Sequence, residues 1–264
     1  MIRVDNLAVT FGKGTPLEKQ ALAGIGLIID AGEFVSVIGS NGAGKSTLLS
    51  AVAGDVPVSG GRILIDGEDV TRQSTARRSA RVARVFQDPL AGSCGQLTIE
   101  ENLALAIARG RSRGLGHALT HERHELFRER VAALGLGLET RLHDRMALLS
   151  GGQRQALALL MATLAKSSVL LLDEHTAALD PGMAEFVVDL TRRTVEEHRL
   201  TTLMVTHSMR QALDLGTRTI MLHEGKLVLD VKGAERAGLT VGALVAMFRK
   251  QRGQTIDDDA LLID

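Results

Sequence analysis

The chain has 264 residues, 45% of them hydrophobic, which suffices for one large domain or two modest lobes around a buried core. Lys plus Arg number 31 and Asp plus Glu number 31, so no net charge would draw the chain to nucleic acid or to an anionic bilayer. Cys94 is its single cysteine, no signal-peptide pattern opens the chain, and no apolar run approaches the roughly 20 residues of a membrane span. These features predict a chain of the reducing cytosol, held at a membrane only through another chain.

The first part of the chain favours short β-strands. Apolar and β-branched residues at 2–4, 7–11 and 25–29 are broken by Gly and Pro and predict a small antiparallel layer. Phe11 ends one of these segments, before a loop that contains Gly12 and Pro16. An exposed aromatic at such a place could stack on a purine base, but an edge-strand core residue would have the same pattern.

A glycine-rich segment follows the buried-type strand 34–38 and leads into a helix expected at 45–53. It consists of Gly39, Ser40, Asn41, Gly42, Ala43, Gly44, Lys45, Ser46 and Thr47. Its glycines allow the backbone N–H groups to wrap around anionic oxygens, with the helix N-terminus adding partial positive charge. Lys45 would add a full charge at the β- and γ-phosphates, and Ser46 a hydroxyl ligand for magnesium. We call residues 39–47 the phosphate loop; a plain surface turn with a lysine is the weaker alternative.

The middle of the chain changes from strand-like to helical patterns. A hairpin strand is expected at 62–67, a solvated basic helix at 72–84, and a strand at 82–86 that ends at Gln87 before Asp88-Pro89. From 97 to about 165 the spacing is helical, with a capping box at Thr98–Glu101, a loop at 109–116 and a helix at 121–134. This block is predicted to form its own lobe, and it closes with Leu149-Ser150-Gly151-Gly152-Gln153 leading into a helix at 156–164.

Strand-like patterns then resume. The apolar strand 169–172 ends in Asp173-Glu174, a helix is expected at 182–198 after Asp180-Pro181, and the strand 201–205 ends before His207. Strand–helix–strand alternation predicts a parallel sheet, in which ligands bind at the carboxyl ends of the strands. The residues at such ends are Gly39, Gln87, Asp173, Glu174 and His207. A hairpin at 219–231, a helix at 240–250 and an acidic tail at 257–264 complete the chain.

Five motifs in this order resemble the ATP-binding cassette family, the nucleotide-binding subunits of ABC transporters, over nearly the whole chain. They are GSNGAGKST at 39–47, Gln87, LSGGQ at 149–153, VLLLDE at 169–174 and His207. The resemblance implies an α/β fold of the P-loop NTPase, ABC-ATPase type, with a mixed sheet core, an N-terminal antiparallel β layer and an inserted helical lobe. It implies one ATPase domain, 1–250, made of a RecA-like lobe (1–87 and 166–250) and a helical lobe (88–165), with a tail at 251–264.

The resemblance also implies the role of each motif toward ATP and Mg²⁺. Asp173 is similar to the carboxylate that holds magnesium, together with Ser46 and Gln87, and Glu174 is similar to the general base that orients the attacking water. Gln87 is further similar to the residue that links magnesium and water to the transport partner. His207 resembles the group that contacts the γ-phosphate. Phe11 matches the base-stacking aromatic, which favours that interpretation over an edge-strand core residue.

Partners follow from the same resemblance. Two cassettes would sandwich two ATP molecules, so that Ser150, Gly151, Gly152 and Gln153 of one copy face the phosphate held by Lys45 of the other, and Asp180 would couple the two sites. A homodimer, a transmembrane permease docked near 91–96 and, indirectly, a substrate-binding protein are expected, with no nucleic acid. The chain would then be cytoplasmic and peripheral on the inner face of the membrane. A bacterial importer is the leading hypothesis; an exporter subunit and a soluble cassette of DNA repair or translation are the alternatives.

One stretch departs from the family pattern. Where the family more often has Pro followed by Ser or Thr after the catalytic glutamate, this chain has His175 within EHTAALDP. That stretch is similar to a branch of bacterial importers whose permease resembles those for branched-chain amino acids, so an amino-acid-type or related small solute is expected. His175 adjoins Glu174 and could perturb it, or it could be a simple surface residue.

Overall fold

The computed structural model describes residues 1–111, 114 and 116–252 and divides into two compact units. Unit 1 contains Met1–Arg78 and the chain from Arg199 onward, and unit 2 contains Ser79–His198. These boundaries differ from those of the expected lobes, 1–87 with 166–250 and 88–165, so the assignment of functional lobes stays a prediction. The acidic tail at 257–264 and part of the expected loop at 109–116 lie outside the described residues.

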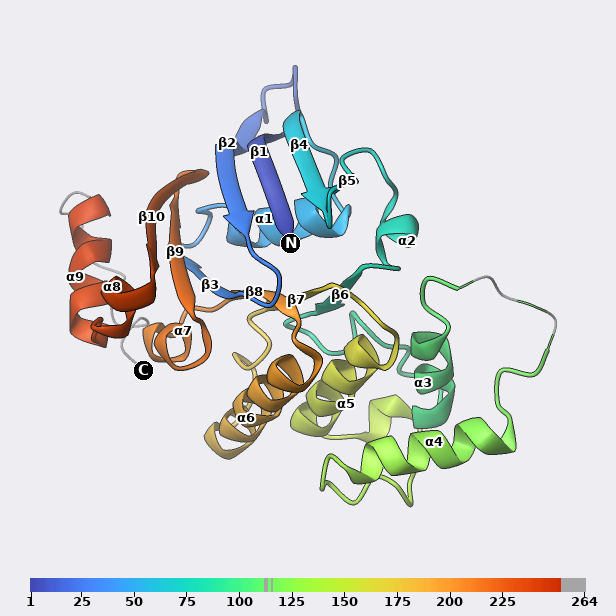
Figure 1. Ribbon diagram of the computed structural model, residues 1–264. Helices are drawn as coiled ribbons and strands as arrows, with labels where there is room; N and C mark the ends of the chain where they lie inside the picture. Colours follow the sequence, from blue (N-terminus) through green and yellow to red (C-terminus); the bar gives the residue numbers. More distant parts are fainter. Residues whose placement is uncertain (112–113, 115, 253–264) are drawn as a thin grey trace. The chain divides into compact units, whose positions relative to one another are not determined.

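Unit 1 contains the antiparallel layer predicted for the first part of the chain (Figure 1). Its strand order is β2-β1-β4-β5, and the strands are β1 (Ile2–Phe11), β2 (Lys19–Ile29), β4 (Gly60–Ile65) and β5 (Glu68–Asp69). The expected segments 2–4 and 7–11 are one continuous strand. The pairing register shifts between Val4 and Leu7, and Asn6 adopts a left-handed φ of 49°, so a bulge lets the strand continue past the break in its pattern.

A second group of strands in unit 1 carries the phosphate loop. β3 (Phe34–Gly39) pairs in parallel with β8 (Thr201–Val205) on one side and with β9 (Arg218–His223) on the other, and β10 (Lys226–Lys232) pairs antiparallel with β9. Every residue of β3 is buried, as expected for a parallel strand covered on both faces. The helices of unit 1 are α1 (Lys45–Ala53), α2 (Thr75–Arg78), α7 (Met209–Leu215), α8 (Gly233–Ala237) and α9 (Val241–Arg252).

The expected basic helix at 72–84 is wrong. Only α2 is helical there, and β6 (Val82–Val85) follows within a few residues. Arg78 is buried rather than solvated, and its guanidinium donates hydrogen bonds to the carbonyls of Ala51, Val52 and Thr71 at 2.5, 3.0 and 2.8 Å. Arg78 thus satisfies carbonyl groups in the last turn of α1, where a positive charge is also favoured by the helix dipole.

Unit 2 is mostly helical around one parallel strand pair, β6 with β7 (Val169–Asp173). Its helices are α3 (Ile99–Ile107), α4 (His121–Ala132), the 3-10 turn η1 (Met146–Leu148), α5 (Gly151–Leu164) and α6 (Pro181–His198). The predicted capping box of Thr98 and Glu101 is present at the start of α3. The helix expected at 156–164 begins earlier, at Gly151, because Ser150 and Gln153 form a second capping box.

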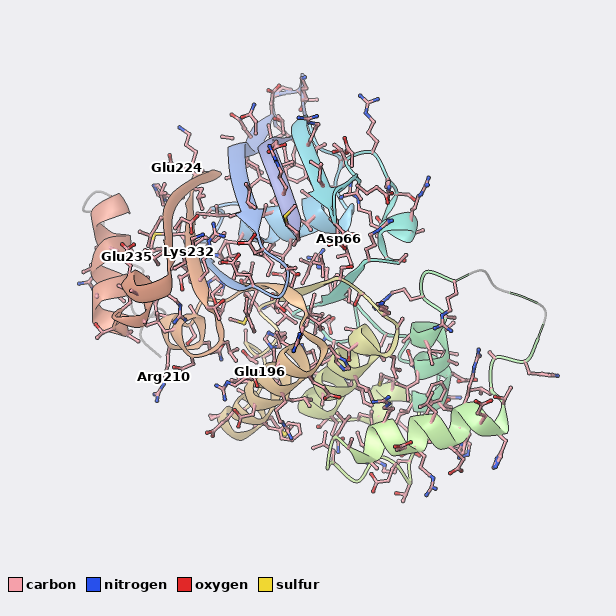
Figure 2. The ribbon with its side chains drawn as sticks, viewed as in Figure 1. Asp66, Glu196, Arg210, Glu224, Lys232 and Glu235 are labelled. Atoms are coloured by element: carbon pink, nitrogen blue, oxygen red, sulfur yellow. The ribbon has the colours of Figure 1, made fainter. Side chains whose placement is uncertain are left out.

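Charged side chains of both signs project from the elements of unit 1. Figure 2 labels Arg210 on α7, Glu224 in the turn between β9 and β10, and Lys232 at the end of β10. This mixture agrees with the balanced composition of the sequence. Among the described residues, every helix is too short or too polar to cross a bilayer.

Candidate functional site

The phosphate loop leaves β3 and turns directly into α1. Gly39, Gly42 and Gly44 have φ angles of 148°, 76° and 101°, which favour glycine over residues with side chains. A Cβ atom on Gly39 would also lie 2.3 Å from the carbonyl oxygen of Leu222, and one on Gly44 would lie 2.6 Å from that of Ala21. The glycines are therefore needed both for the loop's conformation and for the close approach of neighbouring backbone.

Lys45 is the first residue of α1 and is buried at the centre of this loop. Its ammonium group donates hydrogen bonds to the carbonyl oxygens of Gly39 at 2.7 Å and Ser40 at 3.1 Å. The N-cap, Gly44, has no side chain to cap the first turn, and that turn carries no acidic residue. The start of α1 therefore offers backbone N–H groups and a positive charge to an anion.

Two further predicted site residues lie in unit 1. Phe11 ends β1 and is 43% exposed, which excludes the alternative of a buried core residue. His207 is half-buried in the short connection from β8 to α7, just before the N-cap residue Ser208. Both positions follow from the strand ends predicted by the sequence.

Asp173 lies at the end of β7 in unit 2 and makes an ion pair that the sequence analysis missed. Arg84 of β6 donates from Nη2 to Asp173 Oδ2 at 2.7 Å, and both side chains are nearly buried. The Arg84 guanidinium also lies over the ring of Phe86, 4.6 Å from its centroid. The sequence predicts both strands, 82–86 and 169–172, but not that they pair with each other, so it does not place Arg84 beside Asp173.

Glu174 follows with a φ angle of 47°, an uncommon conformation for a residue with a side chain. His175, next along, is 2% exposed, so its interpretation as a surface residue is wrong. Burial lowers the pKa of His175 to about 4, so the imidazole is neutral at pH 7. A neutral ring adds no charge beside Glu174, so any effect of His175 on Glu174 would act through packing or hydrogen bonding.

Ser150 is the N-cap of α5 and is exposed. Its Oγ accepts a hydrogen bond from the Gln153 backbone N–H at 3.2 Å, and Gln153 Oε1 accepts one from the Ser150 N–H at 3.1 Å. The serine hydroxyl still has a hydrogen to donate. The start of α5, like that of α1, therefore combines a helix N-terminus with an accessible donor.

The two glycines of this motif differ in their surroundings. Gly152 is buried, and a Cβ atom there would lie 2.5 Å from the Met183 side chain of α6. A glycine is therefore needed here for the close packing of α5 against α6. Gly151 is more open, with a Cβ position 3.8 Å from Leu179. Asp180, just beyond, is exposed and accepts the Met183 N–H at 3.1 Å, which caps α6.

Gln87 is exposed two residues after the end of β6, and its neighbour Phe86 is hydrogen-bonded to α5. The carbonyl of Phe86 accepts a hydrogen bond from Gln155 Nε2 at 3.2 Å. Further along, Ala147 of η1 donates its N–H to the Gly95 carbonyl at 3.0 Å. The chain before and after Gln87 is thus hydrogen-bonded to residues that follow and precede Ser150.

Comparison with known proteins finds relatives that are all described as components of transport systems. Residues 22–177 match the family described as ABC transporter. The chain is 43% identical over 248 residues to the tyrosine transport ATP-binding protein of Clostridioides difficile (strain R20291), covering 94% of this chain and 98% of the relative. It is 36% identical over 204 residues to the thiamine import ATP-binding protein ThiQ of Yersinia pestis, covering 77% and 81%.

A solved structure with the same fold is also similar in sequence. The ATP-binding cassette MJ0796, in a dimeric post-hydrolysis state bound to ADP and Pi, is 29% identical with a TM-score of 0.76, covering 88% of this chain and 98% of that one. The fold and the motifs define a P-loop ATPase of the cassette type. The chain belongs to the ABC transporter family and is the ATP-hydrolysing component of that kind of system. The predicted fold class, family and enzyme class are confirmed.

Proposed function

We propose that this chain is the ATPase subunit of a bacterial importer, working as an ATP-induced homodimer beneath a separate permease. The observation that carries the proposal is that each unit presents one helix N-terminus built for an anion. In unit 1 this is the start of α1 with Lys45, and in unit 2 it is the start of α5 with Ser150. A cassette that binds ATP between two copies needs both kinds of site.

The remaining residues supply the chemistry of hydrolysis. The Asp173 carboxylate, the Ser46 hydroxyl and the Gln87 amide carry oxygen atoms of the kind that Mg²⁺ prefers, so these residues would hold the magnesium ion, which would neutralise charge on the ATP phosphates. Glu174 would orient the attacking water, and His207 would contact the γ-phosphate. Phe11, exposed at the end of β1, would stack on the adenine.

Import is favoured over export by the named relatives. The C. difficile relative, similar over nearly its full length, is named for tyrosine transport, and the Y. pestis relative is named for thiamine import. An amino acid or a similar small solute is therefore the proposed cargo class. An ABC exporter subunit shares the same motifs, and a soluble cassette has no comparable support among these relatives.

The permease is proposed to dock on unit 2 at 91–96. Leu90 directly precedes this segment, and Leu148 follows Ala147, which is hydrogen-bonded to Gly95; these two apolar side chains are 39% and 71% exposed. Asn102 fixes the segment through hydrogen bonds with the backbone of Cys94 at 2.8 and 3.0 Å. A movement at this surface would be transmitted to Ser150 through the Gly95–Ala147 hydrogen bond and along η1. A substrate-binding protein would act indirectly, through the permease.

The test is the Glu174→Gln variant, which keeps the size and removes the base. Hydrolysis should slow by roughly 10²- to 10⁴-fold, the usual contribution of a positioned base, while ATP binding is retained. Turnover at saturating Mg-ATP and binding of ATP by calorimetry measure the two separately. Turnover within about twofold of the native chain would remove Glu174 from the mechanism, and Glu185→Gln on α6 serves as the matched control.

A further inference from the structure

Three metal-ligating side chains meet in unit 2 at a place that the ATPase mechanism does not use. Glu100 comes from the first turn of α3, His124 from α4, and His143 from the segment between α4 and η1. Glu100 Oε2 lies 2.9 Å from His124 Nδ1, and Glu100 Oε1 lies 2.7 Å from His143 Nδ1. The three ligand atoms all lie within 4.8 Å of one another.

The backbone holds this trio in place. Glu100 donates its N–H to the Leu142 carbonyl at 3.1 Å, and Ile99 donates to the Asp144 carbonyl at 3.0 Å, so the residues on both sides of His143 are tied to the start of α3. α4 is anchored by Phe127 and Val131, both fully buried. The two imidazole rings are stacked, with centroids 5.7 Å apart and planes at 22°. These constraints preorganise the three ligands.

The donor set identifies the class of ion. Two imidazole nitrogens and one carboxylate form the three-ligand set found in zinc sites that keep a fourth position for water, whereas magnesium and calcium prefer oxygens alone. In a tetrahedral site with bonds of about 2.0–2.1 Å, neighbouring ligand atoms stand about 3.3 Å apart. The nitrogen–oxygen distances of 2.7 and 2.9 Å therefore need to open by about half an ångström, as one ion replaces two hydrogen-bonding protons.

The exposure and the charge of the three side chains are also suitable for binding a metal ion. The His143 side chain is 78% exposed and that of His124 is 34% exposed, so an ion can enter from solvent, while Glu100 is only 10% exposed. A nearly buried carboxylate facing two imidazoles provides the negative charge at the inner end of the site. We propose that Glu100, His124 and His143 bind one divalent transition metal of the zinc class, which joins α3, α4 and the segment at 143.

The experiment titrates the nucleotide-free full-length chain with Co²⁺, a spectroscopic substitute for Zn²⁺, in the presence of excess Mg²⁺. Tetrahedral cobalt absorbs strongly and oxygen-ligated octahedral cobalt weakly, so the Mg-ATP residues would add little signal. The expected result is a d–d band that saturates at one equivalent and is abolished by Zn²⁺. Removing any ligand should weaken binding at least tenfold, in line with the sensitivity of metal sites to the groups around the ion.

The variants are chosen so that folding does not confuse the answer. His143→Gln changes an exposed side chain, and His124→Gln and Glu100→Gln complete the set. His121→Gln, an exposed histidine one turn earlier on α4, and Cys94→Ser are controls that should bind like the native chain. Two results would overturn the proposal: no tetrahedral band in the native chain, or a band that survives in His143→Gln and His124→Gln. Either would show that Glu100, His124 and His143 form hydrogen bonds with one another but no metal site.

Discussion

The imidazole of His175 is enclosed between the end of β7 and α6, and its hydrogen bonds define which nitrogen carries the proton. Thr191 donates its hydroxyl to the Val187 carbonyl at 2.7 Å, so its oxygen accepts the 3.0 Å bond from His175 Nε2. Nε2 must then carry the hydrogen, and the ring is neutral. His175 therefore connects the segment after Glu174 to α6 by packing and one hydrogen bond rather than by charge.

This burial predicts a loss of stability in mild acid. The pKa of His175 is about 4 when folded, against 6.5 for the ordinary group, so the unfolded chain binds the extra proton first as the pH falls. The stability that the native state gains from keeping this imidazole neutral is complete above pH 6.5 and is lost progressively toward pH 4. The free energy of unfolding should therefore fall by about 2 kcal/mol between pH 7 and pH 5. Denaturant unfolding of the nucleotide-free chain at both pH values measures it, in a buffer with chelator.

His175→Gln keeps a donor for Thr191 and does not titrate, so its unfolding free energy should fall by about 2 kcal/mol less than that of the native chain over the same pH range. His198→Gln, an exposed position at the end of α6, should leave the native dependence unchanged. An equal pH dependence in the native chain and in His175→Gln would mean that His175 is not the group responsible.

A second prediction at the residue scale concerns Phe11, whose ring is exposed to solvent at the end of β1. If it stacks on adenine, Phe11→Ala should weaken nucleotide binding by roughly 1 to 3 kcal/mol, while Phe11→Tyr should be nearly neutral because a π-face is kept. Titration calorimetry with a non-hydrolysable ATP analogue gives both values. Unchanged affinity in the alanine variant would leave Phe11 without a role in the site.

At the scale of elements, the last turn of α1 depends on a residue from outside the helix. Arg78→Met should lower the free energy of unfolding by about 3 kcal/mol, because it leaves buried carbonyls at Ala51 and Val52 without their charged donor. Thermal and urea unfolding measure the change. Arg77→Met, at the adjacent exposed position, is the control and should be within about 0.5 kcal/mol of the native chain. Equal effects of the two substitutions would contradict the capping role.

Elements whose signals are local could be predicted from the sequence, and those set by distant partners could not. The phosphate loop, the capping box at Thr98 and the buried strand 169–172 depend on residues within a few positions of one another, and all three are present. The run 72–84 has helix-compatible spacing, but burial of Arg78 against α1 decides its structure. Likewise no local pattern connects Glu100 with His143.

The candidate site likewise contains residues that local patterns predict and residues that they do not. The predicted ends of the apolar strands gave the positions of Gly39, Asp173 and His207, because each lies at or just after the end of such a strand. The Arg84–Asp173 ion pair depends on the pairing of β6 with β7, and the burial of His175 depends on α6. Such contacts between separate elements carry no signature in a single sequence, which is why the roles of these residues were missed or misjudged.

At the scale of the whole molecule, the proposed dimer predicts complementation between two inactive variants. Lys45→Ala removes the buried ammonium of the phosphate loop, and Ser150→Arg places a bulky cation at the exposed start of α5. Each should be inactive alone. In an equal mixture, heterodimers would pair the intact Lys45 of one copy with the intact Ser150 of the other, and activity should return to at most about a quarter of native, from half the dimers with one site each.

Two additional measurements make the result decisive. Ser150→Thr keeps both the hydroxyl and the helix cap, so it should retain activity and shows that the arginine acts by obstruction. In a Glu174→Gln background, which should retain bound ATP, size-exclusion chromatography reports dimers directly. Under the sharing model each variant alone stays monomeric with ATP and the mixture forms dimers, because one complete site suffices to join two copies. If Ser150→Arg alone dimerises and hydrolyses ATP like the native chain, then Ser150 takes no part in the partner's site and the proposed sharing of the site through α5 is wrong.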